Sequence, residues 1–598
     1  MKVKIYKFIM FLFGVLFLAS CNDDFLETTP LTEFSDATVW TDPPLVETFI
    51  NNIYWRLDEP FSSGRLKANL VDEGHYRGNA PSLNFNKCLL TPDQIPGLST
   101  PSRYLTWNDI YKSIRYCNIF FEKVGGVPFD NTVTDGKTME ERLTGEAHFL
   151  RAYNYFLLTR MYGGVPIITK AYELTDDFLI ARDSYAKCVD FMVAECDTAI
   201  SLLPRTNSGD NKGRATMGAA MALKSRILLY AASDLFNTTV FTGYSNPEYI
   251  GYTDANRTAR WQKAKDAAKA VIDLGQYSLY KAIPLPGDSV AKNINEMFLA
   301  KNTVEDIFVK YFTTNSTQQI ALVSGPNGWH NWGTNAPLGD LVDDIEMKNG
   351  TPFSWSNPVH AASPYKNRDP RFYANILYEG ATWKPRTADV APTDPLGIVQ
   401  VGRWEKWDAA TSKTVITYGL DTRQSPIENW NGGYPGYYLR KYQDPTVDAQ
   451  YFYQTVPWRF FRYGEIILNY AEACIELGQD AEARTYINLI RRRAGMPDIT
   501  ESGTALRDRY RHERKIELMF EDHRIWDVRR WVIGPQAYHT THIVDVVYKL
   551  LPDKTTSKVP TITSKNFENY AWINKAYFFP ILRDEMNKNS MLVQNPGY

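Results

Sequence analysis

The chain has 598 residues and a formal net charge of −2, because 66 lysines and arginines nearly balance 68 aspartates and glutamates. No basic stripe dominates the sequence, which argues against a nucleic-acid partner. Length alone would suggest three or four domains, and the aromatic content of 14% is high enough to make the positions of the rings informative.

The first twenty residues have the features of a lipoprotein signal peptide. Three early lysines precede an uncharged apolar run over residues 8–19, which is too short to span a bilayer comfortably. The lipobox Leu-Ala-Ser-Cys follows and ends at Cys21, whose thiol takes a diacylglycerol and whose freed amine takes another acyl chain. Several acyl chains anchor a protein more firmly than one. We therefore predict a signal peptide over 1–20, a lipid anchor at Cys21 and an acidic surface tether over 21–37.

Apolar residues at helical spacing predict most of the N-terminal half. The predicted helix over 143–161 ends at a Gly-Gly pair followed by a proline, which is a normal helix stop. A loop rich in glycine and proline is expected over 72–103. The other predicted helices of this half cover residues 38–57, 107–121, 185–203, 215–232 and 261–274.

The clearest helix pair comes later in the chain. Apolar residues over 466–477 and 483–494 share the spacing of one helix face, and Gly478 separates the two runs. Small residues, a glycine in the turn and Pro497 after the second helix are typical of tetratricopeptide repeats. We therefore predict a helical solenoid, over about 38–320 and 445–535, whose repeats are separated by long insertions.

Residues 320–445 have a different character. Helical periodicity fades there, and glycine, proline, asparagine and aspartate dominate. Seven of the fifteen tryptophans lie in this stretch: Trp329, Trp332, Trp355, Trp383, Trp404, Trp407 and Trp430. The pattern predicts a loop-rich aromatic region with a few short strands, carried on the helical scaffold.

No catalytic signature is present among the common motifs, including GxSxG, Walker A and HExxH. The acidic run Asp340, Asp343, Asp344 and Glu346 is expected on a solvated helix start, and residues 507–531 are expected to form a helix with many ion pairs. The cysteines after Cys21 are predicted to be buried thiols without disulfides or metal. No cofactor is expected, although a calcium ion stays an open alternative. The cysteines predicted to be buried thiols are Cys88, Cys117, Cys188, Cys196 and Cys474.

Sugar binding requires flat rings beside polar groups, because pyranoses have apolar C–H faces and equatorial hydroxyls. Residues 325–333 offer both within a turn-rich segment, and the loop around 72–79 is a weaker second candidate. The alternative is that one or both tryptophans of the first segment fill the core. The predicted glycan-binding residues are Asn327, Trp329, His330, Asn331, Trp332, Trp355, Asp72, Tyr76, Arg77 and Asn79.

Several longer segments together resemble the SusD/RagB family of surface nutrient-binding lipoproteins. They cover nearly the whole mature chain. They include Cys-Asn-Asp-Asp-Phe-Leu-Glu from Cys21, Gly-Glu-Ala-His-Phe-Leu-Arg-Ala-Tyr over 145–153, Tyr-Gly-Gly-Val-Pro over 162–166, Tyr-Gly-Glu-Ile-Ile-Leu-Asn-Tyr-Ala-Glu-Ala over 463–473, Glu-Arg-Lys-Ile-Glu-Leu over 513–518 and Gln-Asn-Pro-Gly-Tyr over 594–598.

The resemblance implies a mainly α fold with tetratricopeptide-like helix pairs and a loop-rich half. It also implies a non-catalytic protein on the outer face of the outer membrane, which captures oligosaccharide for a TonB-dependent transporter of the SusC kind. Three alternatives stay open: a peptide-binding protein as in the RagB branch, a surface glycoside hydrolase, and a structural lid without a ligand.

Overall fold

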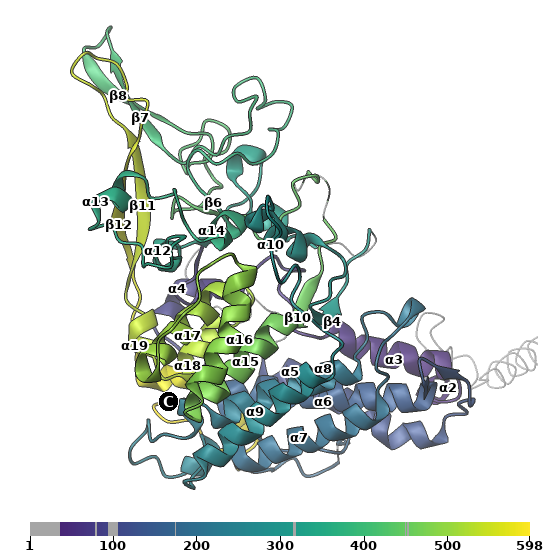
Figure 1. Ribbon diagram of the computed structural model, residues 1–598. Coiled ribbons are helices and arrows are strands. Elements are labelled where there is room, and N and C mark those ends of the chain that lie inside the picture. Colours follow the sequence, from purple (N-terminus) through teal and green to yellow (C-terminus); the bar gives the residue numbers. More distant parts are fainter. Residues whose placement is uncertain are drawn as a thin grey trace, which may run out of the picture.

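The computed structural model describes residues 36–77, 81–93, 106–173, 175–314, 318–448, 450, 452 and 454–598 (Figure 1). The predicted signal peptide, Cys21, most of the tether and Asn79 lie outside these residues. Within the described part of the chain, no helix combines the length and the apolar character needed to cross a membrane.

Paired helices form the lower part of the molecule in Figure 1. Each helix from α5 to α9 packs against the next one along the chain, which confirms the predicted solenoid. A capping box starts α6, in which Thr138 and Glu141 exchange side-chain and backbone hydrogen bonds. The helices are α5 (Trp107–Lys123), α6 (Met139–Tyr162), α7 (Tyr185–Leu202), α8 (Met217–Ala232) and α9 (Arg257–Asp273).

The solenoid continues in the C-terminal half. Helix α15 (Tyr463–Glu476) packs against α9 and pairs with α16 (Asp480–Arg493), so about 190 residues are looped out between two neighbouring repeats. Strands β4 (Asp306–Lys310) and β10 (Trp458–Arg462) form an antiparallel pair at the two ends of residues 311–457, which are the main part of this stretch and which we call the insertion. The insertion therefore leaves and re-enters the scaffold at one place.

Two predicted helices are broken in the structure. The stretch over 38–57 splits into α2 (Asp36–Val39) and α3 (Pro43–Trp55), because a proline pair starts a new helix. The stretch over 507–531 splits into α17 (Gly503–Glu517) and α18 (Arg524–Arg530). There Asp522 has a positive φ and accepts a hydrogen bond from the Lys67 backbone, so a tertiary contact overrides helix propensity.

The loop-rich part of the insertion contains short helices and strands, as predicted, and stands above the scaffold in Figure 1. One four-stranded sheet rises from it, with the order β12-β11-β7-β8. The sequence patterns did not reveal the long hairpin of β11 (Thr540–Tyr548) and β12 (Thr561–Asn569). This hairpin lies far along the chain yet pairs in parallel with β7 (Arg403–Asp408), which in turn pairs with β8 (Lys413–Tyr418).

The remaining elements are short. The helices are α4 (Pro81–Asn86), α10 (Val290–Leu299), α11 (Ile320–Ser324), α12 (Gly339–Asp344), α13 (Pro358–Ala362), α14 (Pro370–Asn375), α19 (Gly534–Ala537) and α20 (Arg583–Lys588). The strands are β1 (Gly74–Tyr76), β2 (Val133–Thr134), β3 (Lys137–Thr138), β5 (Asn335–Pro337), β6 (Ile376–Leu377) and β9 (Tyr438–Leu439).

A network of buried ion pairs joins the insertion to the scaffold. Glu517 of α17 is 5% exposed and pairs with the guanidinium groups of Arg371, Arg462 and Arg493. Burial raises the pKa of Glu517, but the three arginines outweigh it and hold the pKa well below its ordinary value. The predicted ion pairs of this segment are therefore present, and many of them are buried.

Two smaller predictions have mixed outcomes. The five cysteines of the described chain are free and buried, as expected. The acidic run was expected to be solvated, but Glu346 is buried and pairs with Arg491 and Arg509. The other three residues of that run lie on the short helix α12, and Asp344 is its exposed member.

Candidate functional site on an aromatic face

Four aromatic side chains from three segments form the candidate site, which we call the aromatic face. They are Tyr76 at the end of β1, Trp332, Trp430 and Tyr434. Trp430 is 63% exposed, Tyr434 42% and Trp332 38%. Several exposed rings on neighbouring segments indicate a ligand or partner site more strongly than a single exposed ring does.

Backbone contacts bring the three segments together. Strand β1 pairs with β5, with Tyr76 opposite Asn335. Arg77 donates a hydrogen bond of 2.7 Å to the carbonyl of Trp430. Gly333 has a positive φ, and a Cβ there would lie 2.6 Å from the backbone nitrogen of Gly433, so only glycine fits beside the 430–434 segment.

The hairpin of β11 and β12 borders the aromatic face. The Tyr434 ring lies 5.7 Å from the Phe567 ring of β12 and 5.5 Å from the His75 ring of β1. The Arg423 guanidinium lies 4.4 Å from the centre of the Tyr434 ring. One edge of this ring is thus held by packing, while much of its surface stays open.

A groove of about 250 Å³ lies beside Tyr434. Its walls come from the loop around residue 423 and from the four-stranded sheet, and they include Arg403, Arg423, Asp545 and Lys565. The Asp545 carboxylate pairs with both Arg403 and Lys565. The groove therefore sets hydrogen-bonding and charged groups directly beside the exposed rings.

Trp329 does not belong to this open surface. It is 1% exposed, its indole nitrogen donates to the carbonyl of Pro385 at 3.0 Å, and the Arg386 guanidinium lies 3.4 Å from the ring centre. The indole therefore has no face open to a ligand in this structure, and it packs a small core beneath the loops.

The polar residues next to Trp329 also hold the loops together. Asn327 is fully buried, and it donates to the carbonyls of Thr422 and Glu428. His330 lies between the carboxylates of Glu428 and Asp389, at 2.7 and 2.9 Å. Burial lowers the pKa of His330, but these two hydrogen bonds outweigh it and raise the pKa overall.

Asn331 is also closed to a ligand. Its side chain is buried and packs against Gly325, where the absence of a Cβ leaves room for it. Asp72 is buried and pairs with Lys515 and Arg524 of the C-terminal helices. Trp355 is half-buried, and its indole nitrogen donates to Asp343 at 2.8 Å.

Among the predicted residues, Trp332, Tyr76 and Arg77 are therefore the three whose segments the structure brings together; Trp332 is exposed, and Tyr76 and Arg77 are half-buried. Sequence reasoning missed Trp430, Tyr434 and Arg423 as candidates. The segment Asn-Trp-Asn-Gly-Gly-Tyr over 429–434 has the same mixture of turn residues and rings as 325–333, and that pattern could have revealed it.

Glu73 adjoins the site and is expected to make stability depend on pH. Burial raises its pKa to about 8, and the neighbouring Asp72 carboxylate adds to the effect. An unfolded glutamate titrates near ~4.3, so between roughly pH 4.5 and 8 only the folded state keeps this proton. The stabilising free energy that the protonated Glu73 contributes is fully present below the unfolded pKa. It decreases as the pH rises from there and is lost once the pH has passed through about 8.

Glu73→Gln should therefore raise the thermal midpoint at pH 8.5, by a stabilisation of about 1 kcal/mol or more, and should leave it unchanged at pH 4. Midpoints measured across this range by circular dichroism test the expectation. The exposed Glu140→Gln is the control and should alter neither value. An unchanged pH slope in Glu73→Gln would contradict the assignment.

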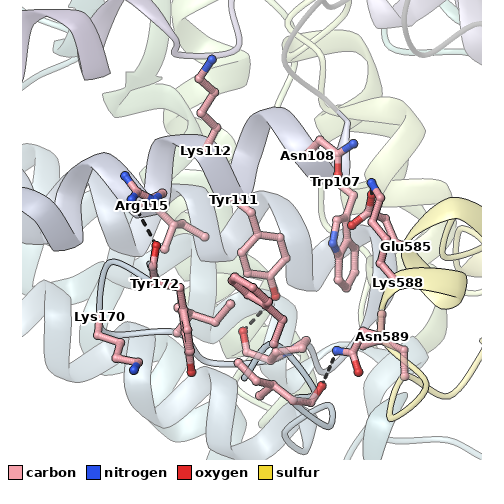
Figure 2. A pocket seen from close by; sticks show the side chains of 16 residues that line it. Trp107, Asn108, Tyr111, Lys112, Arg115, Lys170, Tyr172, Glu585, Lys588 and Asn589 are labelled. Carbon is pink, nitrogen blue, oxygen red and sulfur yellow. Dashed lines mark hydrogen bonds and ion pairs between the residues drawn. The ribbon is translucent and has the colours of Figure 1, made fainter. Parts of the chain in front are cut away.

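A separate pocket of about 550 Å³ lies on the helical side, between α5, residues 166–180 and α20 (Figure 2). Trp107, Tyr111 and Tyr172 line it, most of its surface is apolar, and some of its polar groups are used internally. Tyr111 donates to the carbonyl of Pro166, and Arg115 donates to that of Tyr172. This lining suits an apolar group better than a sugar chain, so we take the aromatic face as the candidate site.

Comparisons with known proteins agree with the architecture. A family model described as the SusD family matches residues 298–598, and one described as starch-binding associating with outer membrane matches residues 24–229. SusD-like protein P38 of Formosa agariphila is 24% identical, over 89% of this chain and 93% of its own length.

Two solved structures from Bacteroides fragilis share the fold. A SusD-like protein superposes with a TM-score of 0.71 at 28% identity, covering 95% of this chain and all of the other. A SusD-like carbohydrate binding protein superposes with a TM-score of 0.67 at 23% identity, covering 93% of this chain and all of the other. These likenesses confirm the predicted mainly α, SusD-like fold.

Proposed function

The chain belongs to the SusD family, whose members are carbohydrate-binding proteins associated with the outer membrane, and we propose that it captures a glycan at the aromatic face. The observation that carries this proposal is that the backbone brings the segments of Tyr76, of Trp332 and of residues 430–434 together, and that Trp332, Trp430 and Tyr434 have exposed rings. Sugar rings stack on such side chains through their C–H faces.

The neighbouring polar groups support binding to sugar hydroxyls. Arg77 and Arg423 lie at the face, and the groove beside Tyr434 adds Lys565 and Asp545. An open face with a side groove accommodates several units of a chain better than one enclosed monosaccharide.

Binding without hydrolysis fits the carboxylates of the groove. A glycosidase needs two carboxyl groups flanking the scissile bond. Asp421 is buried and pairs with Arg386, and Asp545 pairs with Arg403 and Lys565, so both are already committed to cations. These contacts favour a binding protein over a surface glycoside hydrolase.

We further propose that the protein is lipid-anchored through Cys21, faces the cell exterior and passes its glycan to a TonB-dependent transporter of the SusC kind. The lipobox supports the anchor. The apolar pocket of the helical side would offer such a transporter a place for an apolar side chain, on a surface distinct from the aromatic face.

Affinity electrophoresis against a panel of polysaccharides tests glycan capture. Trp430→Ala should weaken binding at least tenfold, because an exposed tryptophan at the centre of a binding surface commonly contributes about 2 kcal/mol. Trp55→Ala is the matched control, since Trp55 is 54% exposed but lies on α3 of the helical scaffold. Its binding should equal that of the unchanged protein.

Retardation by no polysaccharide would contradict the proposal, and binding of oligopeptides in its place would favour a peptide-binding role. Equal loss in Trp430→Ala and Trp55→Ala would show that the aromatic face is not the site. Release of reducing ends by the purified protein would contradict a purely binding function.

A further inference from the structure

Two arginines at the aromatic face have no acidic partner. Arg77 and Arg423 form no ion pair with any carboxylate in the described residues. The structure gives Arg77 one hydrogen bond, to the carbonyl of Trp430, and places Arg423 over the Tyr434 ring. Both side chains are half-buried.

Buried arginines elsewhere in this chain are satisfied either by acids or by several carbonyls, and Arg182 and Arg368 are examples of the second kind. Arg386, close to the same loops, holds Asp394 and Asp421, and Arg462 holds Glu305, Glu517 and Glu521. A partly buried guanidinium without an acid loses hydration and gains no compensating pair. Arg77 and Arg423 differ from Arg182 and Arg368 in having fewer hydrogen bonds that would offset their partial burial.

Both cations lie at the same segment, because Arg77 donates to the carbonyl of Trp430 and the Arg423 guanidinium lies 4.4 Å from the centre of the Tyr434 ring. Burial lowers the pKa of Arg77, and the Arg423 charge is the next cause. In addition, the Arg77 Nε is buried and has no hydrogen-bond partner among the described residues. A second, like charge beside an unsatisfied donor is unfavourable in the free protein, and an anion placed between the two would relieve it.

Nearby carboxylates do not offset this charge. Asp545 is shared by Arg403 and Lys565, and Asp421 is bound to Arg386. The surroundings of Tyr434 therefore keep an excess of positive charge, directly beside rings that can stack on a sugar.

We propose that the aromatic face selects an acidic polysaccharide, whose carboxylate or sulfate group binds between Arg77 and Arg423 while its sugar rings stack on Trp430 and Tyr434. A guanidinium binds planar carboxylates in a bidentate fashion and binds tetrahedral oxyanions equally well, so both anions fit. This inference rests on the proposed glycan-binding function and specifies its substrate class.

The test compares each acidic polymer with a neutral counterpart of the same backbone. Polygalacturonate is paired with its carboxyl-reduced form, and dextran sulfate with dextran, so the two arms distinguish a carboxylate from a sulfate. Isothermal titration is done with the full mature chain. The unchanged protein should bind at least one acidic polymer at least tenfold more tightly than its neutral counterpart, and added salt should reduce that preference.

The double variant Arg77→Gln/Arg423→Gln should lose the preference, so that its affinity for the acidic polymer falls to its affinity for the neutral one. The double variant Lys413→Gln/Lys558→Gln removes the same net charge outside the aromatic face and should keep the preference. Circular dichroism confirms that both variants are folded.

Equal binding of acidic and neutral polymers by the unchanged protein overturns the inference but leaves glycan capture standing. The same holds if only neutral polymers bind, or if the preference survives in the arginine variant. If neither kind of polymer binds, and no other glycan does, both the inference and the proposed function fail.

Discussion

Replacing Glu517 with glutamine is expected to destabilise the protein by about 3–5 kcal/mol, although the side chain keeps its size. Glu517 pairs with Arg371, Arg462 and Arg493, and its carboxylate is almost completely buried. A neutral amide would leave these cations without their shared counter-charge, in surroundings from which water is excluded. Denaturation by urea, followed by tryptophan fluorescence, measures the loss.

Asp508→Asn is the matched control, because Asp508 lies on the same helix but is exposed. This control should shift the stability by no more than about 0.5 kcal/mol. If Glu517→Gln behaved like the control, the buried network would not be what joins α17 to the insertion. Isothermal titration on Glu517→Gln at low temperature should show normal glycan binding, since the aromatic face is made by other segments.

The two tryptophans at 329 and 332 should respond in opposite ways to substitution by alanine. Trp329→Ala removes a buried indole and its hydrogen bond to Pro385, and is expected to cost about 3–5 kcal/mol of stability. Trp332→Ala removes an exposed ring, so stability should stay within about 0.5 kcal/mol while glycan affinity falls severalfold. Urea denaturation and affinity electrophoresis on the same two variants separate the effects.

A result in which Trp332→Ala unfolds the protein, or in which Trp329→Ala binds poorly while remaining fully stable, would contradict the roles that the structure gives them. Trp383→Ala, in the same small core as Trp329, is a useful comparison and should resemble Trp329→Ala. The variants at 329 and 332 thus test whether burial alone distinguishes a tryptophan that stabilises the loops from a tryptophan that binds a ligand.

These two residues also show how far sequence reasoning reaches. Helices such as α6 and α15 could be predicted because helical periodicity and glycine stops are local signals. No local signal separates Trp329 from Trp332, because both stand among the same turn residues. Their difference arises from Arg386 and Pro385, which lie more than fifty residues further along the chain.

The long hairpin was missed for a related reason. Strand β12 is mostly polar and half-exposed, so it lacks the apolar alternation by which strands are recognised. Its partner β11 pairs in parallel with β7, about 140 residues away. Trp430 and Tyr434 could have been proposed from composition, but their meeting with Tyr76 depends on contacts that only the folded chain provides.

The antiparallel pair of β4 and β10 has a consequence for how such proteins diversify. Because both ends of the insertion meet in one short ladder against α8, residues 311–457 can vary in length and composition above the helical solenoid, provided that Arg371 and Lys441 keep their pairs with the carboxylates of residues 513–521. The hairpin of β11 and β12 would have to change together with them, since it shares a sheet with β7. A graft of these two segments together with β1 and Arg77 should therefore carry ligand preference from one scaffold to another, much as loops are exchanged on an antibody framework.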